Sequence, residues 1–188
     1  MKAMKIYTGY GDDGHTQLLG GQRVRKNDLR VAVCGALDEL NAVFGLVASR
    51  QIPSALTPRI QAIQSDLFKF GSTVAAVGAE TKMNLPEVKE ADRQRLEEEI
   101  DAMEEHLKAL QNFLLPGGSE GAATMHLARA VCRRAERWLV ELATIHDDFD
   151  EEVLFKYLNR LGDWCFVAAR LINHELGVEE PLWRGTDA

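Results

Sequence analysis

The chain has 188 residues and a formal net charge of −7 at pH 7, with 46% hydrophobic and 27% charged residues. This composition is ordinary for one globular domain with a substantial core. The acidic balance argues against general nucleic-acid binding, which requires a broad basic surface that neutralises phosphates.

The cysteines and the N-terminus indicate a cytoplasmic protein. Cys34, Cys132 and Cys165 form no Cys-x-x-Cys pair, so we expect buried apolar thiols in a reducing compartment, with neither disulfides nor zinc. The first residues lack the apolar core of a signal peptide, and no apolar run approaches the roughly 18 residues of a membrane span. We therefore expect no membrane association.

In chain order, the first 26 residues predict a glycine-rich loop, with a short strand at 5–7 as its one regular element. Five helical segments are expected after it, over residues 28–50, 56–77, 87–110, 119–145 and 147–176. Asn27 or Asp28 can cap the first segment and Ser119 the fourth, and Gly177 stops the last. The pattern predicts an all-α fold, an antiparallel five-helix bundle with a glycine-rich N-terminal loop.

Apolar stripes at helical spacing support the bundle. In the fourth segment we expect the buried face to consist of Leu127, Val131, Ala135, Trp138 and Leu142. In the fifth we expect Leu154, Leu158, Leu161, Cys165, Ala168 and Ile172. The rest of the fifth segment mixes polar and aromatic residues, namely Asn159, Arg160, Asp163, Phe166 and Arg170. That mixture suits a subunit interface or a ligand wall better than open water.

Four arginines gather in the fourth segment of this acidic chain. Residues 122–140 contain four arginines and one glutamate, a local net charge of +3. Arg129, Arg133 and Arg137 lie at i, i+4 and i+8, and like charges at that spacing destabilise an isolated helix. A partner carboxylate or a polyanionic ligand would compensate them, because guanidinium groups bind both in bidentate fashion. A solvated basic face is the alternative.

The segment Gly9-Tyr-Gly11-Asp-Asp-Gly14 matches the glycine pattern of dinucleotide-binding folds but lacks their strand before it and their helix after it. We therefore reject a dinucleotide fold. The exposed N–H groups of such a loop can still bind phosphate, with Thr8, Thr16 and Lys26 as further donors. An unstructured N-terminal tail is the alternative.

Metal and P-loop chemistry find no support in the sequence. A ferritin-like site needs Glu-x-x-His pairs on helices, and no histidine of this chain has a glutamate three residues before it. The acidic run Glu97–Glu99, with Glu104 and Glu105, is interpreted as the solvated face of the third helix. The G-x-x-x-x-G-K-[ST] pattern is absent.

Five motifs in order resemble one enzyme family. They are Tyr7-Thr-Gly-Tyr-Gly-Asp-Asp-Gly-His-Thr16, Gly35-Ala-Leu-Asp-Glu-Leu-Asn41, Phe113-Leu-Leu-Pro-Gly-Gly-Ser119, Ala128-Arg-Ala-Val-Cys-Arg-Arg-Ala-Glu-Arg137 and Tyr157-Leu-Asn-Arg-Leu-Gly-Asp163. With Pro181-Leu-Trp183 they span nearly the whole chain and resemble the ATP:cob(I)alamin adenosyltransferases of the propanediol-utilisation (PduO) type. The resemblance implies one domain over residues 1–188, with an ATP-binding loop over 1–26 and a bundle over 27–188. It also implies a homotrimer with active sites between subunits.

The resemblance also implies roles for individual residues. It implies ATP binding by residues of the N-terminal loop, namely Thr8, Gly9, Tyr10, Gly11, Thr16, Gln17 and Lys26. It also implies ATP binding by the fourth helix of the adjacent subunit, through Arg133, Arg134, Ala135, Glu136 and Arg137, and by Asn159 of the fifth helix. Arg133 would act in catalysis, together with a pair formed by Arg129 and Asp38 across the interface. Phe113 would lie beneath the corrin ring. No protein ligand for a metal is identified.

The implied reaction transfers the 5′-deoxyadenosyl group of ATP to Co(I) of a reduced corrinoid and releases triphosphate, with Mg²⁺ accompanying ATP. Cobalt is the nucleophile, so no protein nucleophile is required. A flavin-type reductase and an adenosylcobalamin-dependent enzyme are the implied protein partners. Gly9 stands where the family usually has Lys or Arg. A non-catalytic nucleotide- or corrinoid-binding carrier or sensor is therefore the alternative, and a plain structural bundle is a more distant one.

Overall fold

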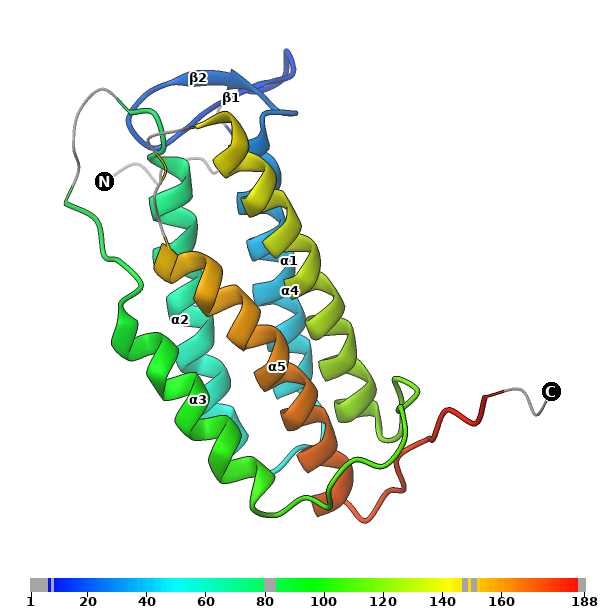
Figure 1. Ribbon diagram of the computed structural model, residues 1–188. Coiled ribbons are helices and arrows are strands. Elements are labelled where there is room, and N and C mark those ends of the chain that lie inside the picture. Colours follow the sequence, from blue (N-terminus) through cyan, green and yellow to red (C-terminus); the bar gives the residue numbers. More distant parts are fainter. Residues whose placement is uncertain (1–6, 8, 80–83, 147–148, 150–151, 186–188) are drawn as a thin grey trace, which may run out of the picture.

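The computed structural model describes residues 7, 9–79, 84–146, 149 and 152–185. Within them the elements are β1 (His15–Gln17), β2 (Arg23–Arg25), α1 (Leu29–Ala48), α2 (Leu56–Ala75), α3 (Glu90–Glu104), α4 (Glu120–Ile145) and α5 (Glu152–Glu175). The helices form an elongated bundle with the small hairpin β1–β2 at one end (Figure 1). The predicted five-helix bundle is confirmed.

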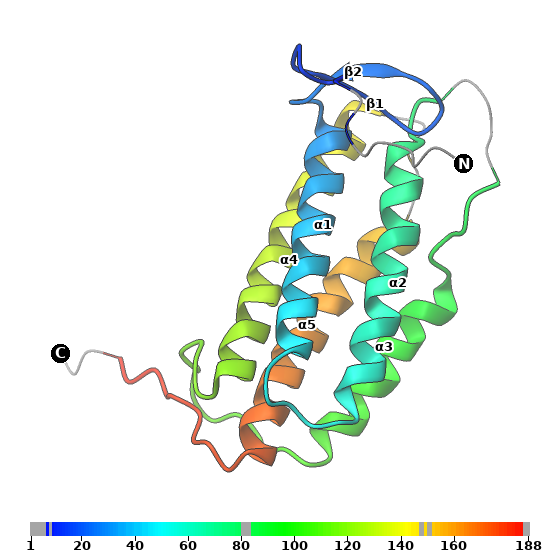
Figure 2. The same ribbon diagram turned by 180° about the vertical axis from the view of Figure 1, so that it is seen from behind.

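The helices pack in a fixed order of neighbours. Contacts join α2 to α1, α1 to α4, α4 to α5 and α5 to α3. The view from behind shows α1 between α2 and α4, with α5 covering the far side (Figure 2). Neighbouring helices alternate in direction except for α3 and α5, which run the same way (Figure 1). Residues 84–89 run along the outside of the bundle before α3 begins (Figure 1).

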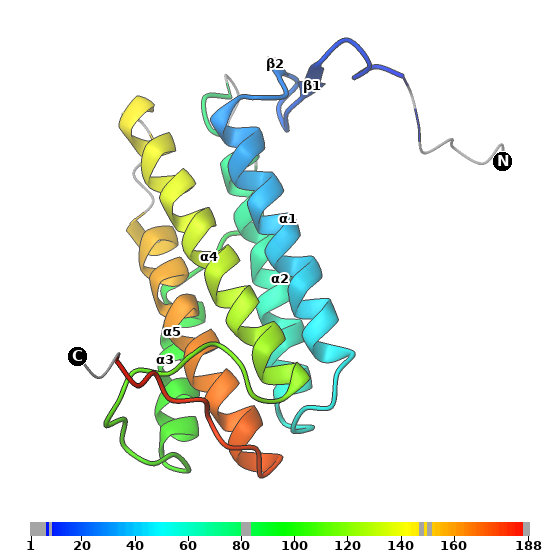
Figure 3. The ribbon, with the colours of Figure 1, turned by 90° about the vertical axis from the view of Figure 1, so that its right-hand side faces the viewer.

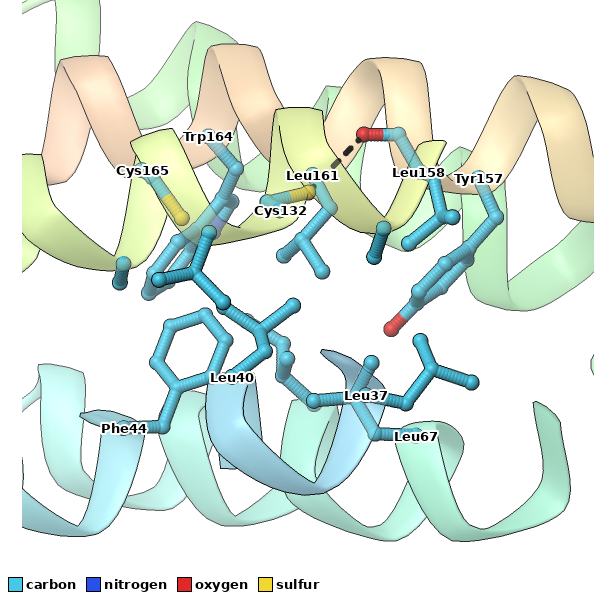
Figure 4. Close-up of a cluster of buried hydrophobic side chains, with 14 of the residues drawn as sticks. Leu37, Leu40, Phe44, Leu67, Cys132, Tyr157, Leu158, Leu161, Trp164 and Cys165 are labelled. Atoms are coloured by element: carbon cyan, nitrogen blue, oxygen red, sulfur yellow. Dashed lines mark hydrogen bonds between the residues drawn. The ribbon is translucent and has the colours of Figure 1, made fainter. Parts of the chain in front are cut away.

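The core lies where α1, α2, α4 and α5 meet (Figure 4). The residues labelled there are at most 2% exposed and include Leu37, Leu40, Phe44, Leu67, Cys132, Tyr157, Leu158, Leu161, Trp164 and Cys165. The rings of Phe44 and Trp164 meet edge to face, with centroids 6.3 Å apart. Cys132 Sγ donates to the carbonyl of Leu158 at 3.3 Å. Burial of these apolar side chains is the main force that assembles the bundle.

The cysteines are thiols in the described part of the chain, as the sequence predicts. Cys132 and Cys165 are buried, and Cys34 is half-buried. Burial raises the pKa of the Cys34 thiol to about 11, so it stays protonated at neutral pH. We infer that these side chains serve in packing, since an unreactive thiol behaves as a small apolar group.

The predicted stripe on α5 is confirmed, but the stripe on α4 is partly wrong. Every predicted residue of the α5 stripe is buried. On α4, Val131, Ala135 and Leu142 are buried, whereas Leu127 is 51% and Trp138 is 36% exposed. The buried face instead runs through residues that include Met125, Ala128, Cys132 and Leu139. This face contains small residues such as Ala128 and Cys132 as well as larger ones, and Leu127 and Trp138 lie outside it.

Helix ends follow the capping signals more closely than the apolar pattern. Asp28 caps α1 by accepting from Arg30 N at 3.0 Å, and Ser119 caps α4. α3 is shorter than predicted, because Asp92 accepts from Lys89 N at 2.8 Å and so sets its start at Glu90. The aspartates expected to open α5 at 147, 148 and 150 lie outside the described residues.

The N-terminal segment folds into a hairpin where the sequence predicted a loop. β1 and β2 pair antiparallel, with Thr16 opposite Val24. Gly20 and Gly21 make the turn with φ of 101° and 88°, a region that side chains strongly disfavour. Strands of three residues are too short to show an alternating pattern, so periodicity could not reveal them. Of the strand expected at 5–7, only Tyr7 is described, and it is not in a strand.

A buried arginine attaches the hairpin to the bundle. Arg30 is 8% exposed and donates to Gln22 Oε1 at 2.8 Å and to the carbonyl of Val77 at 2.9 Å. It also forms an ion pair with Asp28 at 2.8 Å. Gln22 in turn donates to the carbonyl of Gly78. The hairpin is therefore held against the end of α2 by contacts that the sequence did not reveal.

The acidic run of α3 is not simply a solvated face, so that interpretation is corrected. Glu97 accepts from Arg160 Nε at 2.9 Å, and Glu99 accepts from Trp164 Nε1 at 2.7 Å. These two carboxylates face α5, because its polar side chains reach across to them. Glu98, Glu104 and Glu105 are exposed as predicted.

α1 is more apolar than expected, since the sequence analysis predicted no apolar run long enough to span a membrane. By length and composition it could cross a membrane, with a mean hydropathy of 1.6, although 39% of that window is buried inside the bundle. One side of the helix fills the core. Exposed residues on its other side include Gly35, Ala42 and Leu46.

Candidate functional site

The predicted arginine cluster lies on the surface of α4 beside α5. Arg133 is exposed, and the carbonyl of Arg133 accepts from Arg137 Nη1 at 3.0 Å. Glu136 Oε1 accepts from Asn159 Nδ2 at 3.2 Å, which joins the two helices. Asn159 therefore lies beside the arginine cluster of the same chain.

Two predicted members of the cluster make other contacts within the chain. Arg134 forms an ion pair with Glu39 of α1. Ala135 is 0% exposed and packs in the core. Its side chain cannot reach a surface ligand, which corrects the implied role of Ala135 as far as the side chain is concerned.

Arg129 lies on the same helix, beside an aromatic pair. Its guanidinium lies 5.6 Å from the centroid of the Phe166 ring, and the His126 ring lies 6.0 Å from the same centroid. Burial, and secondarily the Arg129 charge, lower the pKa of His126, so the imidazole is neutral at physiological pH. Asp38 is exposed on α1, and no ion pair joins it to Arg129 within the described chain.

A cavity of about 830 Å³ opens next to Arg129, between α3, α4, α5 and the loop that precedes α4. Phe113 and Phe166 contribute aromatic surface to it, and Ile100 contributes aliphatic surface. Asp101 and Glu104 of α3 also line it. Glu97, Arg160 and Asp163 line it as well, so its walls are partly apolar and partly charged. A cavity of this size with both kinds of surface can hold an organic ligand that carries polar substituents.

Phe113 is presented to this cavity on an exposed loop. The side chain is 78% exposed and meets the Trp183 ring edge to face at 6.1 Å. The C-terminal segment holds the loop, since Trp183 N donates to the carbonyl of Phe113 at 2.8 Å and Leu115 N donates to that of Pro181 at 2.7 Å. Trp183 was not among the predicted site residues. The signal for it in the sequence was its place in the Pro181-Leu-Trp183 segment that belongs to the family resemblance.

The glycine-rich loop brings several predicted nucleotide ligands together. A Cβ on Gly11 would lie 3.3 Å from Lys26 Nζ, so this backbone and the ammonium group are neighbours. Gly9 has φ of 72° and its carbonyl accepts from Asp12 N at 3.3 Å. Thr16 belongs to β1. Tyr10 and Gln17 are exposed on the same segment, and Thr8 lies outside the described residues.

The described residues do not offer a ready metal site. No group of three or more His, Cys, Asp or Glu side chains is arranged among them to hold an ion.

One chain does not bring all the predicted residues to one place. The hairpin lies at the end of the bundle where α1 begins, whereas the loop before α4 and the C-terminal segment lie at the opposite end (Figure 3). The arginines lie along α4 between them. Lys26 and Phe113 therefore cannot contact the same small ligand within a single subunit.

Comparison with known proteins shows the family of the chain. Residues 6–172 match the model of the cobalamin adenosyltransferase family. The chain belongs to this family. The resemblance found in the five motifs is thereby confirmed.

Similar members of the adenosyltransferase family match nearly the whole length of the chain. The chain is 40% identical over 181 residues to the cobalamin adenosyltransferase of Cupriavidus metallidurans, covering 96% of this chain and 94% of that protein. It is 39% identical over 179 residues to the corrinoid adenosyltransferase of Bacillus subtilis, covering 93% and 90%. A variant PduO-type ATP:corrinoid adenosyltransferase from Lactobacillus reuteri, complexed with cobalamin and ATP, matches with a TM-score of 0.91 and 34% identity, covering 96% and 100%.

Proposed function

We propose that this protein is an ATP:corrinoid adenosyltransferase. The observation that carries the proposal is the aromatic cavity of about 830 Å³ beside Phe113. That cavity occurs in a fold with a TM-score of 0.91 to a relative complexed with cobalamin and ATP. The rings of Phe113 and Phe166 offer aromatic surface to the ring of a macrocycle, and the charged residues that also line the cavity can meet polar groups at its edge.

The reaction we propose needs no nucleophile from the protein. The electron pair of Co(I) forms a new Co–C5′ bond at the ribose as the C5′–O bond breaks, and triphosphate leaves with the electron pair of the broken C5′–O bond. Negative charge grows on the leaving triphosphate, and Arg133 and Arg137 of the α4 cluster are the cations we assign to it. Mg²⁺ enters with ATP, and its charge adds to theirs.

ATP is assigned to the glycine-rich loop of one subunit and to α4 of the next. Gly11 and Lys26 lie together in the loop, so bare N–H groups and an ammonium can meet the phosphates. Gly9 supplies no cation where relatives usually have one. We therefore assign Lys26 the larger share of phosphate binding from this segment.

A homotrimer is part of the proposal, with each site formed between subunits. α1 and α4 expose apolar side chains that water disfavours, including Leu46 at 42%, Leu127 at 51% and Ile145 at 60%. A neighbouring subunit that covers them could also bring Asp38 to Arg129, and the hairpin of one chain to the arginine cluster of another. This arrangement would unite residues that a single chain keeps apart.

Phe113 is assigned to the lower face of the corrin. An exposed phenyl ring at the mouth of the cavity can displace a water or base from cobalt, which leaves the metal four-coordinate and easier to reduce. The Trp183 ring packs edge to face against the phenyl ring, with the two ring centroids 6.1 Å apart.

The deciding experiment is anaerobic turnover with chemically reduced cobalamin and MgATP, followed by absorption spectroscopy. Formation of adenosylcobalamin with an equal amount of triphosphate is expected. Binding of both substrates without the spectral change would favour a carrier or sensor.

The cellular setting we propose is the cytoplasm, where a flavin-type reductase could supply Co(I) and an adenosylcobalamin-dependent enzyme could receive the product. Free thiols at Cys34, Cys132 and Cys165 fit a reducing compartment. Fractionation of cells and affinity capture with adenosylcobalamin-loaded protein would test this.

A further inference from the structure

The loop that carries Phe113 is attached to α5 by two buried polar side chains. Arg170 and Asn173 lie one helical turn apart near the end of α5 and are 6% and 1% exposed. Side chains this polar are buried only where their hydrogen-bonding groups have partners. All their side-chain partners among the described residues lie outside α5, either in the loop or in the C-terminal segment.

Arg170 joins the start of the loop to the C-terminal segment. Its Nη2 donates to the carbonyl of Lys108 at 2.7 Å, and its Nε donates to Glu180 Oε1 at 3.0 Å. The planar guanidinium is suited to this double contact, because its donors point in fixed and diverging directions. A lysine at this position has one charged nitrogen and cannot reproduce that geometry.

Asn173 holds the other end of the loop. Its Nδ2 donates to the carbonyl of Gly117 at 3.1 Å, and its Oδ1 accepts from Ser119 N at 2.9 Å. Ser119 also caps α4, so this contact connects the loop to the start of the arginine-bearing helix. Gly118 has φ of 98°, and a Cβ there would lie 2.4 Å from Asn173. A residue with a side chain at position 118 would therefore clash with Asn173.

Between these two attachment points Phe113 has little support of its own. The C-terminal segment runs beside the loop (Figure 3), and the hydrogen bond from Trp183 N fixes the backbone of Phe113. Since the phenyl ring is 78% exposed, its position depends on the loop backbone and on the Trp183 ring.

We propose that Arg170 and Asn173 are positioning residues of the corrinoid site. They hold both ends of the loop and, through Glu180, the segment that carries Trp183, so that Phe113 faces the cavity. This inference rests on the proposed function. A misplacement of about 1 Å at a reacting centre can lower a rate by about 10²-fold. The effect falls on the corrinoid, because the residues assigned to ATP lie in the N-terminal segment, on α4 and, for Asn159, about three helical turns of α5 before Arg170.

The test compares Glu180→Gln and Arg170→Lys with the control Glu120→Gln. The control removes the charge of an exposed glutamate that pairs with Arg50 at 3.1 Å, at the same end of the bundle but outside the loop. For the two test variants we expect the KM for reduced corrinoid to rise roughly tenfold while the KM for ATP stays near that of the wild type. Without any ligand, amide hydrogen exchange at Leu115 and Trp183 should become faster, whereas the control should change neither quantity.

Wild-type exchange rates and an unchanged corrinoid KM in both variants would overturn the proposal. An equal rise in both KM values would do so as well, because it would indicate a general loss of structure. If the wild-type protein binds corrinoid but does not adenosylate it, the proposed function fails. The exchange rates at Leu115 and Trp183 would still decide whether Arg170 and its partner Glu180 hold the loop.

Discussion

Arg133 is the cluster member best placed to meet a triphosphate. Its side chain is exposed and has no ion-pair partner among the described residues, whereas Arg134 is paired with Glu39. Arg133→Ala should therefore lower kcat by roughly 10²–10³, the usual loss when one donor to developing charge is removed. Steady-state kinetics checks this, with Arg50→Ala as a control from an exposed ion pair far from the cluster. An unchanged kcat would assign Arg133 to the solvated surface.

Gly9 combines a missing cation with an unusual backbone. Its φ of 72° disfavours any side chain, although a Cβ would meet nothing closer than Asp12 Oδ2 at 3.5 Å. The conformational cost of a side chain there is about 1–2 kcal/mol. Gly9→Ala measures that cost alone, so Gly9→Lys should bind ATP more tightly than Gly9→Ala in calorimetry. Equal Kd values would mean that Lys26 or Arg25 already supplies the charge.

Phe113→His tests whether Phe113 keeps the lower axial position of cobalt free of a ligand. If Phe113 lies beneath the corrin, an imidazole in its place can ligate cobalt and make reduction to Co(I) harder. Adenosylation from Co(II)alamin should then collapse while ATP affinity is kept, and the EPR spectrum of bound Co(II) should lose its four-coordinate signature. Phe113→Leu is the control, because it keeps an apolar side chain without a ligand. A histidine variant that keeps both signature and activity would remove Phe113 from beneath the ring.

At the scale of the elements, one buried carboxylate joins three helices. Asp66 of α2 is 2% exposed and accepts from Lys69 Nζ at 2.7 Å and from the Tyr157 hydroxyl of α5 at 3.0 Å, and it pairs with Arg95 of α3. Burial and the nearby Asp66 charge raise the pKa of Tyr157 well above its usual value, which keeps this hydroxyl a donor.

Asp66→Asn should lower the free energy of unfolding by about 2–3 kcal/mol, since it leaves two cations without their buried partner, each still partly reached by water. Urea denaturation measures this. Glu90→Gln removes an exposed partner of Arg93 and should leave the free energy of unfolding close to that of the wild type, because water screens this ion pair. If both variants lost a similar free energy of unfolding, the contacts of Asp66 between the helices would contribute no more than an exposed ion pair.

At the scale of the whole molecule, assembly should depend on a pair that one chain does not form. Asp38→Ala and Arg129→Ala should each weaken the trimer in sedimentation velocity, and the double variant should cost less than the sum of the two. Glu39→Ala is the matched control, because Glu39 has its partner Arg134 within the same chain. Strict additivity, or a wild-type monomer at micromolar concentration, would contradict the intersubunit site.

The sequence by itself determined the class of fold, the main helix boundaries and the family. Helical periodicity, N-cap residues such as Asp28 and Ser119, and the Pro116-Gly117-Gly118 break act within a few positions of themselves, so they can be read without a structure. The five motifs carried the family because they occur in order along nearly the whole chain. Individual roles assigned to Arg133, Lys26 and Phe113 stay predictions.

Only the tertiary structure decided which side chains meet. Periodicity could not choose between adjacent faces of α4, because the choice depends on where the neighbouring helices pack against it. It also could not show that Arg170 and Asn173 hold the Phe113 loop, since their partners lie far away in sequence. Contacts of this kind form only when the whole bundle closes, and their energies depend on burial that no local pattern records.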